Sequence, residues 1–421
     1  MNGKDAHSAS VRPLPDWLAY IERQHPQSIA LGLDRVREVF SALEIKISCP
    51  VVTVGGTNGK GSTCAILESV LGFAGYRAGL YSSPHLLRYN ERVRIAGREA
   101  EDAVLAEAFA AVESARGSIP LTYFEFGTLA AFFLFSRESL DVAILEVGLG
   151  GRLDAVNVVD ADCAVLTSIG IDHVEFLGDS REEIGREKAG IFRPGRPAVI
   201  ADPDPPRSVL GSDAKLLLLG RDFGYQPQGT QWSYWGPAGR RSGLAHPALR
   251  GAMQLRNASA AFAALDTLRE QLPIAMQDVR RALAEVALPG RFQVLPGRPQ
   301  IVLDVAHNPE AAAALAANLG DSGFSPETIA VFGMLRDKDI AGVVRAVAPR
   351  ITRWHLTSLP GPRGADAEEL FEILSKENIK TQATKHPTVA SALAAAKNEA
   401  AENDKIVVFG SFLTVAGAYG R

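Results

Sequence analysis

The chain has 421 residues, of which 47% are hydrophobic and 22% are charged, and its formal net charge is −4. This composition is ordinary for a globular protein, and the length allows about two to four domains. The negative charge gives no global attraction to nucleic acid or to an anionic membrane, so we expect neither as a partner. Three cysteines without paired-ligand spacing and a polar N-terminus favour a cytoplasmic location.

Apolar spacing and turn residues predict strands that alternate with helices in the first half of the chain. Strands are expected at residues 51–54, 77–81, 141–147, 161–169 and 197–200, and helices at 17–21, 33–43, 62–74, 101–116, 124–135 and 180–189. Short runs with Gly, Gln, Tyr and Trp at 215–235 predict a β-hairpin region, followed by helices at 257–272 and 276–286.

A second series of alternating strands and helices follows the Pro-Gly turns near residues 289 and 296. Strands are expected at 301–305, 328–332, 354–357 and 406–409, and helices at 309–319, 340–347, 365–375 and 389–400. We therefore predict an α/β protein with two domains. The first, residues 1–294, is a P-loop domain with a mostly parallel sheet, and the second, residues 295–421, is a smaller Rossmann-like α/β domain.

A glycine-rich stretch at residues 51–63 has the sequence Val-Val-Thr-Val-Gly-Gly-Thr-Asn-Gly-Lys-Gly-Ser-Thr. Its glycines let several backbone N–H groups point at one anion beside the positive end of a helix, and Lys60 adds a cation for the outer phosphates of a nucleotide. The stretch departs from G-x-x-x-x-G-K-[ST] at Val54 and Gly61, and its hydroxyl comes at Ser62. An ordinary glycine-rich turn is the alternative, but the lysine and the hydroxyls favour a phosphate loop.

Further polar groups follow other strands of the predicted sheet. Ligands of open parallel sheets gather at the carboxyl ends of the strands, where Ser83, Glu146 and His173 are expected beside Lys60. A carboxylate flanked by apolar residues is costly to bury without a cation, so Glu146 favours a Mg²⁺ site. His173 alone would be a structural histidine, because Mg²⁺ prefers oxygen. By composition, Lys188 is a solvated lysine near the end of a helix.

Seven motifs occur together in chain order. They are TNGKGS at 57–62, SSPH at 82–85, NER at 90–92, EVGLGGRLDA at 146–155, DH at 172–173, KAGI at 188–191 and DVAHNP at 304–309. The set resembles the bacterial dihydrofolate synthase/folylpolyglutamate synthase family, within the Mur-ligase superfamily. The resemblance runs from about residue 17 to the C-terminus.

This resemblance implies an ATP-dependent ligase with Mg²⁺ as cofactor and ATP as co-substrate. It would add L-glutamate to dihydropteroate, giving dihydrofolate, and to tetrahydrofolate species, giving polyglutamates, through an acyl phosphate. At neutral pH a carboxylate is a poor electrophile, and phosphorylation gives it a leaving group. The mixed anhydride must be kept from water, which a cleft closing between two domains achieves. Only small-molecule substrates and a monomeric chain are expected.

The resemblance also implies the roles of individual residues. The ATP-binding residues would be Thr57, Asn58, Gly59, Lys60, Gly61, Ser62, Asn257, Arg291 and Asp304, the metal ligands Ser83, Glu146 and His173, and the catalytic residues Lys60, Glu146, His173 and Lys188. Lys188 resembles the carbamylated lysine of the family, which forms only from the neutral amine and so needs a lowered pKa. His307 would face the glutamate side.

Three segments resemble pterin contacts of the bifunctional members. They are Ser28, Ile29 and Ala30; Thr122, Tyr123, Phe124 and Glu125; and Leu153, Asp154 and Ala155. The chain departs from the relatives at Met253-Gln254, where a His-Gln pair is expected, so the adenine contacts there stay open.

Two alternatives stay within the ligases: a folylpolyglutamate synthase without dihydropteroate activity, and another Mur-type amino-acid ligase. A murein peptide ligase is disfavoured because only about fifty residues precede the phosphate loop. A dinucleotide-dependent oxidoreductase is disfavoured because Leu153 stands where the G-x-G-x-x-G fingerprint needs glycine.

Overall fold

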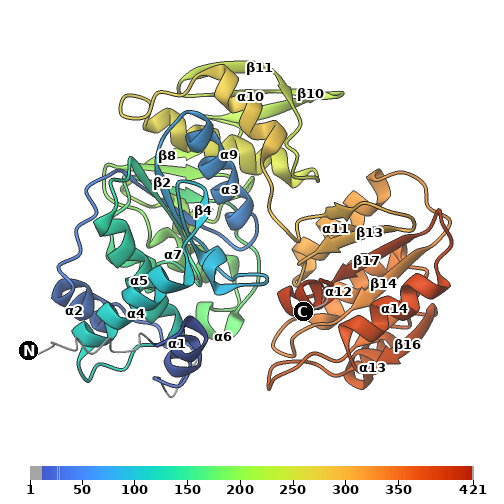
Figure 1. Cartoon of the computed structure of the whole chain (residues 1–421). Helices are drawn as coiled ribbons and strands as arrows, with labels where there is room; N and C mark the ends of the chain where they lie inside the picture. Colours follow the sequence, from blue (N-terminus) through green and yellow to red (C-terminus); the bar gives the residue numbers. More distant parts are fainter. Residues whose placement is uncertain (1–11, 26, 28, 420–421) are drawn as a thin grey trace, which may run out of the picture.

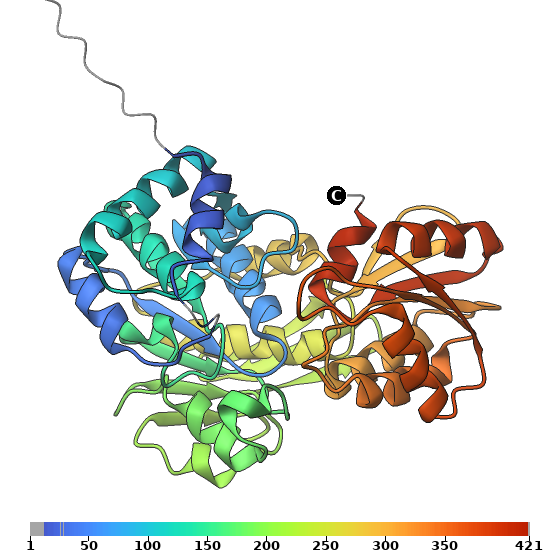
Figure 2. The ribbon, with the colours of Figure 1, turned by 90° about the horizontal axis from the view of Figure 1, so that it is seen from below.

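The computed structural model describes residues 12–25, 27 and 29–419, and the chain forms two α/β bodies joined near residue 290 (Figure 1). Seen from below, the second body, in orange and red, lies beside the first (Figure 2). Each body is built on its own sheet, and no strand is shared between the two sheets. The prediction of an α/β fold with a mostly parallel first sheet and a separate second α/β domain is confirmed.

The first sheet has eight strands in the order β4-β3-β2-β5-β1-β6-β7-β8. Their bounds are β1 Val51–Gly55, β2 Ala78–Tyr81, β3 Val93–Ile95, β4 Arg98–Glu99, β5 Val142–Glu146, β6 Cys163–Leu166, β7 Pro197–Ile200 and β8 Lys215–Leu218. The strands from β2 to β8 in this order are parallel, whereas β3 and β4 pair antiparallel at one edge. The parallel strands therefore bring their carboxyl ends to one side of the sheet.

Helices cover both faces of this sheet because successive residues of a buried strand point to opposite sides. In β1, Val51 belongs to one apolar core and Val52 and Val54 to the other. The first core is closed by α1 Leu14–Ile21, α2 Asp34–Ala42, α4 Asp102–Arg116, α5 Tyr123–Arg137 and α7 Arg181–Ala189. The second core is closed by α3 Lys60–Phe73, α9 Met253–Thr267 and α10 Met276–Glu285. Short helices α6 Val174–Leu177 and α8 Arg207–Leu210 connect strands at the edges.

The region predicted as a hairpin forms a small antiparallel sheet, but it begins later than expected. Its strands are β9 Gly224–Gln228, β10 Gln231–Gly236 and β11 Gly239–Ala245. Residues 215–218, which we assigned to the hairpin region, are instead β8 and pair parallel with β7. The small sheet packs on α9, where Trp232 stacks on Phe262 with ring centroids 5.8 Å apart. Helix α9 is buried almost completely and starts at residue 253, before the predicted start at 257.

The second sheet has the order β12-β13-β17-β14-β15-β16. Its strands are β12 Gln293–Leu295, β13 Gln300–Asp304, β14 Thr328–Phe332, β15 Arg353–Thr357, β16 Gln382–His386 and β17 Lys405–Phe409. Helices α11 Pro309–Asp321, α12 Ile340–Val347 and α13 Ala367–Lys376 cover one face, and α14 Val389–Glu399 and α15 Phe412–Ala418 cover the other. The sequence prediction lacked β12, β16 and α15, because these elements are short or only partly buried.

The division at residues 294 and 295 stays a prediction. Strand β12 spans this position and pairs antiparallel with β13, so the sheet pairing assigns the whole strand to the second body. Among the described residues, no helix combines the length and the apolar character needed to cross a bilayer.

Candidate active site

A cavity lies between the two bodies, at the carboxyl ends of the first sheet's strands. Its walls come from the loops after β1, β2, β5 and β6 on one side, and from the segment after β13, α11 and the start of α15 on the other. From the ATP, metal, catalytic and glutamate-side residues predicted above, the lining includes Thr57, Asn58, Gly59, Lys60, Gly61, Ser62, Ser83, Glu146, His173, Lys188, Asn257, Arg291, Asp304 and His307. Residues separated by up to 250 positions in sequence are thus brought to one cavity.

The phosphate loop is held in place by the end of β6. The backbone N–H of Thr57 donates to the carbonyl of Ser168 at 2.8 Å, and that of Asn58 donates to the Ser168 hydroxyl at 2.9 Å. Helix α3 then begins at Lys60, so its N-terminus lies at the cavity. The N–H groups of its first turn have no intrahelical partners and point out of this end of the helix. The loop therefore presents an anion site that is fixed by its own domain.

Gly59 is required by both conformation and space. Its φ is +91°, and a Cβ at this position would lie 2.6 Å from Oδ1 of Asn257. Asn257 comes from α9, whose early start places it against the loop, and its amide donates to Gln254 at 3.1 Å. The predicted nucleotide contact Asn257 thus lies beside the phosphate loop. Gln254, from the Met253-Gln254 pair where the chain differs from its relatives, lies next to it.

Lys60 and Glu146 form the charged centre of the first wall. The Lys60 ammonium donates to the carbonyls of Gly56 and Thr57 at 2.9 and 3.2 Å. Glu146 is 4% exposed, and its Oε2 accepts a hydrogen bond from the backbone N–H of Ser83 at 3.2 Å. Burial raises the pKa of Glu146 and lowers that of Lys60, while the charge of each opposes the shift of the other.

Lys188 is buried, contrary to the solvated lysine that its composition alone suggested. It lies at the end of α7 and is 4% exposed. Burial and then the nearby charge of Lys60 lower its pKa to about 7. A substantial fraction of the amine is therefore neutral at physiological pH, which is the form that reacts with carbon dioxide.

The second wall contributes Arg291 and Asp304. Asp304, at the end of β13, accepts hydrogen bonds from the N–H groups of Phe292 and Ala306 at 2.9 and 2.8 Å. Nη2 of Arg291 lies 3.6 Å from where a Cβ on Gly61 would stand. Burial lowers the pKa of Arg291 and raises that of Asp304, and the charge of each opposes the shift of the other. Arg291 thus brings a cation from the second body to the phosphate loop.

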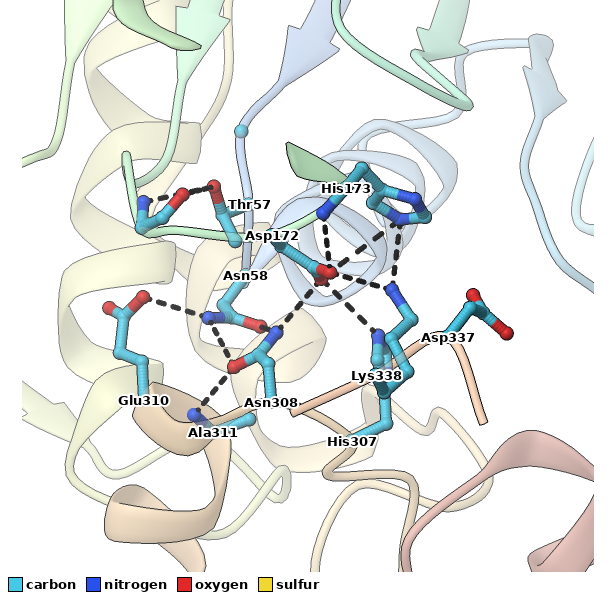
Figure 3. A network of polar contacts seen from close by, with 12 residues as sticks. Thr57, Asn58, Asp172, His173, His307, Asn308, Glu310, Ala311, Asp337 and Lys338 are labelled. Carbon is cyan, nitrogen blue, oxygen red and sulfur yellow. Dashed lines mark hydrogen bonds and ion pairs between the residues drawn. The ribbon is translucent and has the colours of Figure 1, made fainter. Parts of the chain in front are cut away.

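His173 lies in the same cavity but faces a lysine of the second body. Its Nε2 lies 3.1 Å from Nζ of Lys338, and Lys338 also contacts Asp172 at 2.6 Å (Figure 3). Burial, opposed by the Asp172 carboxylate, lowers the pKa of His173 to about 4. His307 also lies here, with Nε2 3.8 Å from the Asp172 carboxylate. Of the three predicted metal ligands, Glu146 and Ser83 are in direct contact, and His173 lines the same cavity, where it contacts Lys338.

Of the predicted pterin residues that the structure describes, none lines this cavity. Phe124 packs against Gly148, where a Cβ would lie 2.6 Å from the ring, and Gly148 itself lines the cavity. Asp154 accepts N–H bonds from Leu149 and Val156 at 2.8 and 3.0 Å. Burial, opposed by these bonds, raises the pKa of Asp154 to about 6. The two segments therefore lie behind the turn at 148–150, next to the cavity.

The carboxylate of Glu125 is already engaged inside the first body. It accepts from the N–H of Thr122 at 2.8 Å, which completes the capping box of α5, and it pairs with Arg35 at 2.7 Å. Arg35 also donates to the carbonyl of Ala30 at 2.9 Å. The two predicted pterin segments around residues 30 and 122 are thus connected through Arg35, while Ser28 lies outside the described residues.

Sequence reasoning missed Glu310 of the second wall, Asn308 and Lys338 beside that wall, and the role of Asp172. Lys338 follows strand β14 within the run Asp337-Lys338-Asp339. The rule that ligand-binding groups follow the carboxyl ends of parallel strands would have found it, had we applied it to the second domain as to the first.

Two family models match the chain. The model described as "Mur ligase middle domain" matches residues 54–265, and "Mur ligase, glutamate ligase domain" matches residues 290–412. These models define the class of the protein: a Mur-type ligase, with the phosphate loop in one domain and the second wall of the cleft in the other.

Individual relatives narrow the class. The chain is 45% identical over 412 residues to the dihydrofolate synthase/folylpolyglutamate synthase of Escherichia coli (strain K12), covering 97% of this chain and 95% of that protein. It is 43% identical over 430 residues to the protein of the same name in Haemophilus influenzae. The chain belongs to the dihydrofolate synthase/folylpolyglutamate synthase family of Mur ligases.

Solved structures agree with this assignment. The structure described as "E.coli FolC in complex with DHPP and ADP" superposes with a TM-score of 0.92 at 44% identity, covering 97% of both chains. A bifunctional folylpolyglutamate synthase/dihydrofolate synthase with Mn, AMPPNP and L-glutamate bound superposes with a TM-score of 0.89 at 44% identity, covering 97% of this chain and 98% of that one.

Proposed function

We propose that the protein is an ATP-dependent ligase that adds L-glutamate to dihydropteroate, giving dihydrofolate, and to tetrahydrofolate species, giving polyglutamates. The observation that carries this is the cavity between the two bodies, where a phosphate loop, a buried carboxylate and an arginine from the other body meet. Relatives solved with ADP, and with Mn, AMPPNP and L-glutamate, support the same reaction.

The proposed reaction has two steps. First, a carboxylate oxygen of the pteroate or folate attacks the γ-phosphorus of ATP, and the bond to the bridging oxygen of ADP breaks. The α-amine of glutamate then attacks the acyl carbon, loses a proton, and inorganic phosphate leaves. The N–H groups at the start of α3 and Lys60 bind the phosphates, and Arg291 stabilises charge on the transferring phosphoryl group.

A divalent metal ion, Mg²⁺ in the proposed reaction, neutralises phosphate charge when it is bound. Glu146 fits such an ion, because its buried carboxylate has a raised pKa and therefore gains from a cation in the cavity. Mg²⁺ keeps several waters and phosphate oxygens, so one carboxylate with the neighbouring Ser83 is a sufficient protein contribution. We assign Glu146, Ser83 and His173 to this role.

Lys188 is proposed to act as a carbamate. The burial that lowers its pKa to about 7 supplies the neutral amine that the modification needs. Once modified, the side chain is an anion in a region that Lys60 makes positive, so the charge of Lys60 would stabilise the product. An anion here orients groups around the phosphates, whereas an ammonium would compete with the metal.

The remaining assignments are part of the same proposal. Asn257 and Asp304 contact the nucleotide, and His307 faces glutamate. The pterin contacts are Ile29, Ala30, Ser28, Thr122, Tyr123, Phe124, Glu125, Leu153, Asp154 and Ala155. Their support is the packing of Phe124 on Gly148, at the cavity's edge. We further propose a cytoplasmic monomer that acts only on small molecules, which the net charge of −4 supports.

A substrate panel tests the reaction. Purified protein with ATP, Mg²⁺ and L-glutamate is given dihydropteroate, tetrahydrofolate or neither, and ADP release and the products are measured. We expect ADP release with each acceptor and one added glutamate per ADP. ADP release with tetrahydrofolate but not with dihydropteroate would make the protein a folylpolyglutamate synthase without dihydropteroate activity. No ADP release with either acceptor would indicate another Mur-type ligase.

A further inference from the structure

One buried ion pair connects the two bodies. Asp172 follows β6 in the first body, and Lys338 lies between β14 and α12 in the second. The Lys338 ammonium lies 2.6 Å from Oδ1 of Asp172, and the two side chains are only 6% and 10% exposed. Charges are seldom buried this far without a partner, and here each partner comes from a different body.

Asp172 gathers more than one group of the second body. The amide of Asn308 donates to its Oδ2 at 3.3 Å, and Nε2 of His307 lies 3.8 Å from the same oxygen. The first body contributes the N–H of His173, which donates to Oδ1 at 2.8 Å and fixes the carboxylate (Figure 3). A single carboxylate thus holds the loop after β14 and the start of α11.

A second set of contacts joins the phosphate loop itself to the other body. The amide groups of Asn58 and Asn308 donate to one another's oxygens at 3.3 and 3.0 Å, and Asn58 also donates to Glu310 at 2.9 Å. Asn308 is the N-cap of α11, where its oxygen accepts from the N–H of Ala311 at 2.9 Å. Asn308 therefore connects Asp172, the phosphate loop and the end of a helix.

The position of the pair determines which process it controls. Asp172 and Lys338 belong to different bodies, so separation of the bodies would break the pair and let water reach both charges. Removing one partner from a buried pair leaves the other charge unpaired, which is strongly unfavourable. Because opening the cleft relieves that cost, the loss of one partner should shift the equilibrium between closed and open cleft rather than unfold either body.

We propose that Asp172 is a positioning residue that sets closure of the cleft: it holds Lys338 and Asn308 of the second body against the phosphate loop. Closure in turn brings Arg291 and Asp304 over the nucleotide site. The inference rests on the proposed ligase function, since it assigns the contact that assembles the second wall for that reaction. Asp172 itself touches no reacting atom and acts through the groups it holds.

Small-angle X-ray scattering tests the proposal without requiring activity. The radius of gyration of wild type and of Asp172→Asn is measured for the free chain and with AMPPNP, Mg²⁺ and L-glutamate. Asparagine keeps the size of the side chain and removes its charge. We expect a larger radius of gyration for Asp172→Asn than for wild type in the nucleotide-loaded sample, with both proteins melting cooperatively. Equal radii in both conditions would overturn the proposal.

A matched control separates closure from general damage. Asp202 is also a buried carboxylate, 5% exposed in its side chain, but its partner Arg181 belongs to the same body, at 3.0 Å. Asp202→Asn should therefore leave the radius of gyration unchanged. If Asp202→Asn expands the protein as much as Asp172→Asn, the effect is not specific to the interdomain contact, and the proposal is wrong.

The partner residue supplies the second arm. Lys338→Met should expand the loaded protein as Asp172→Asn does, and the double variant should be no more open than either single one, because both remove one interaction. Lys405→Met is the control, since Lys405 is buried but bonds within its own body, to Ser322 at 2.7 Å. Additive expansion in the double variant would contradict a shared contact.

Kinetics then connect closure to the reaction. With tetrahydrofolate as acceptor, Asp172→Asn should lower kcat by about tenfold or more, because Arg291 and Asp304 are no longer held over the nucleotide. The Kd for ATP should rise only by the loss of the Asp304 contact, because the phosphate loop is held by its own domain. An unchanged kcat in an opened variant would overturn the link to closure. If wild type releases no ADP with any acceptor, the proposed function fails, but the scattering result still decides the role of Asp172.

Discussion

The two walls of the cleft are organised in different ways. The phosphate-loop wall, defined by Lys60, Ser83, Glu146 and Lys188, is held by hydrogen bonds and packing inside the first body. The C-terminal wall, defined by Arg291, Asp304 and His307, reaches its place only when the two bodies meet. Lys338, which lies outside the cavity lining, pairs with Asp172 of the first body.

We therefore expect the phosphate-loop wall to bind the nucleotide and the C-terminal wall to complete the site when the two bodies meet. The charges of the phosphate-loop wall are buried beside one another, and burial displaces the pKa values of Lys60, Glu146 and Lys188. The C-terminal wall adds a cation and a carboxylate when the cleft is closed. Substitutions in the phosphate-loop wall should therefore change nucleotide binding and kcat together. Substitutions in the C-terminal wall should change mainly kcat.

The largest effect is expected for Lys60→Ala. The variant loses the cation at the phosphates, and kcat should fall by about 10³-fold, while the melting temperature stays close to wild type because burial already disfavours the Lys60 charge in the folded chain. ADP release and a thermal melt measure the two quantities. Lys397→Ala, on the exposed side of α14, is the control; activity retained in Lys60→Ala would refute the phosphate-loop assignment.

A smaller loss is expected for Arg291→Gln in the C-terminal wall. The variant removes the cation that the second body brings to Gly61, so kcat should fall by about 10²-fold with the Kd for ATP nearly unchanged. Initial rates and equilibrium nucleotide binding distinguish the two. Arg298→Gln, which breaks an exposed pair with Glu402, is the control. A large loss of ATP binding in Arg291→Gln would remove the proposed distinction between the walls.

Lys188 should make activity depend on bicarbonate and pH. With its pKa lowered to about 7, the amine is mostly protonated below pH 6 and mostly neutral at pH 8. Protein depleted of bicarbonate at low pH should therefore lose activity, and added bicarbonate should restore it faster as the pH rises from 6 to 8. Rates measured over this range test the carbamate, and ¹³C-bicarbonate labelling detects it directly.

The lowered pKa of Lys188 also determines how the free energy of unfolding changes with pH. Between about pH 7 and 10.5 the unfolded chain binds a proton on Lys188 that the unmodified folded chain does not, so the free energy of unfolding should rise with pH in that window. Lys188→Met should flatten this rise and make activity insensitive to bicarbonate. Wild-type turnover in Lys188→Met would exclude a carbamate role.

The smallest effect on activity is expected away from the cleft. The Tyr234 hydroxyl donates to Asp266 at 2.6 Å in a buried site that Arg241 completes at 2.7 Å, where the small sheet packs on α9. Tyr234→Phe should lower the free energy of unfolding of the first body by ~1–3 kcal/mol and leave kcat unchanged. Denaturant unfolding measures this, with Tyr225→Phe on β9 as control. A drop in kcat would show that the small sheet communicates with the cleft.

Most of the fold was predictable because it depends on local patterns. The buried strands β1, β5 and β14 are short runs rich in β-branched residues, and the helix predicted at 180–189 is α7, which begins with a capping box of Ser180 and Glu183. The misassigned β8 is a short apolar run, Leu216 to Leu218, without β-branched residues, and its sequence does not determine which strand it pairs with. Edge strand β16 was missed because its residues are polar and only partly buried.

The candidate site was likewise predictable from local sequence only in part. Local sequence was sufficient to predict the phosphate loop, Glu146 at the end of β5 and the helix that carries Lys188, since each depends on neighbours along the chain. Sequence alone made Lys188 a solvated side chain, and only packing shows that it is buried with a pKa near 7. Burial of a charged side chain is decided by residues distant in sequence.

The tertiary structure also decided which groups face one another across the cleft. Asp172 and Lys338 are 166 positions apart, and Asn58 and Glu310 are 252 positions apart, so no local pattern relates them. The amino-acid order determined the elements and the chemistry carried at the strand ends. The docking of two separately folded sheets determined the pairing of those charges, because electrostatic and hydrogen-bond partners depend on distance in space and not along the chain.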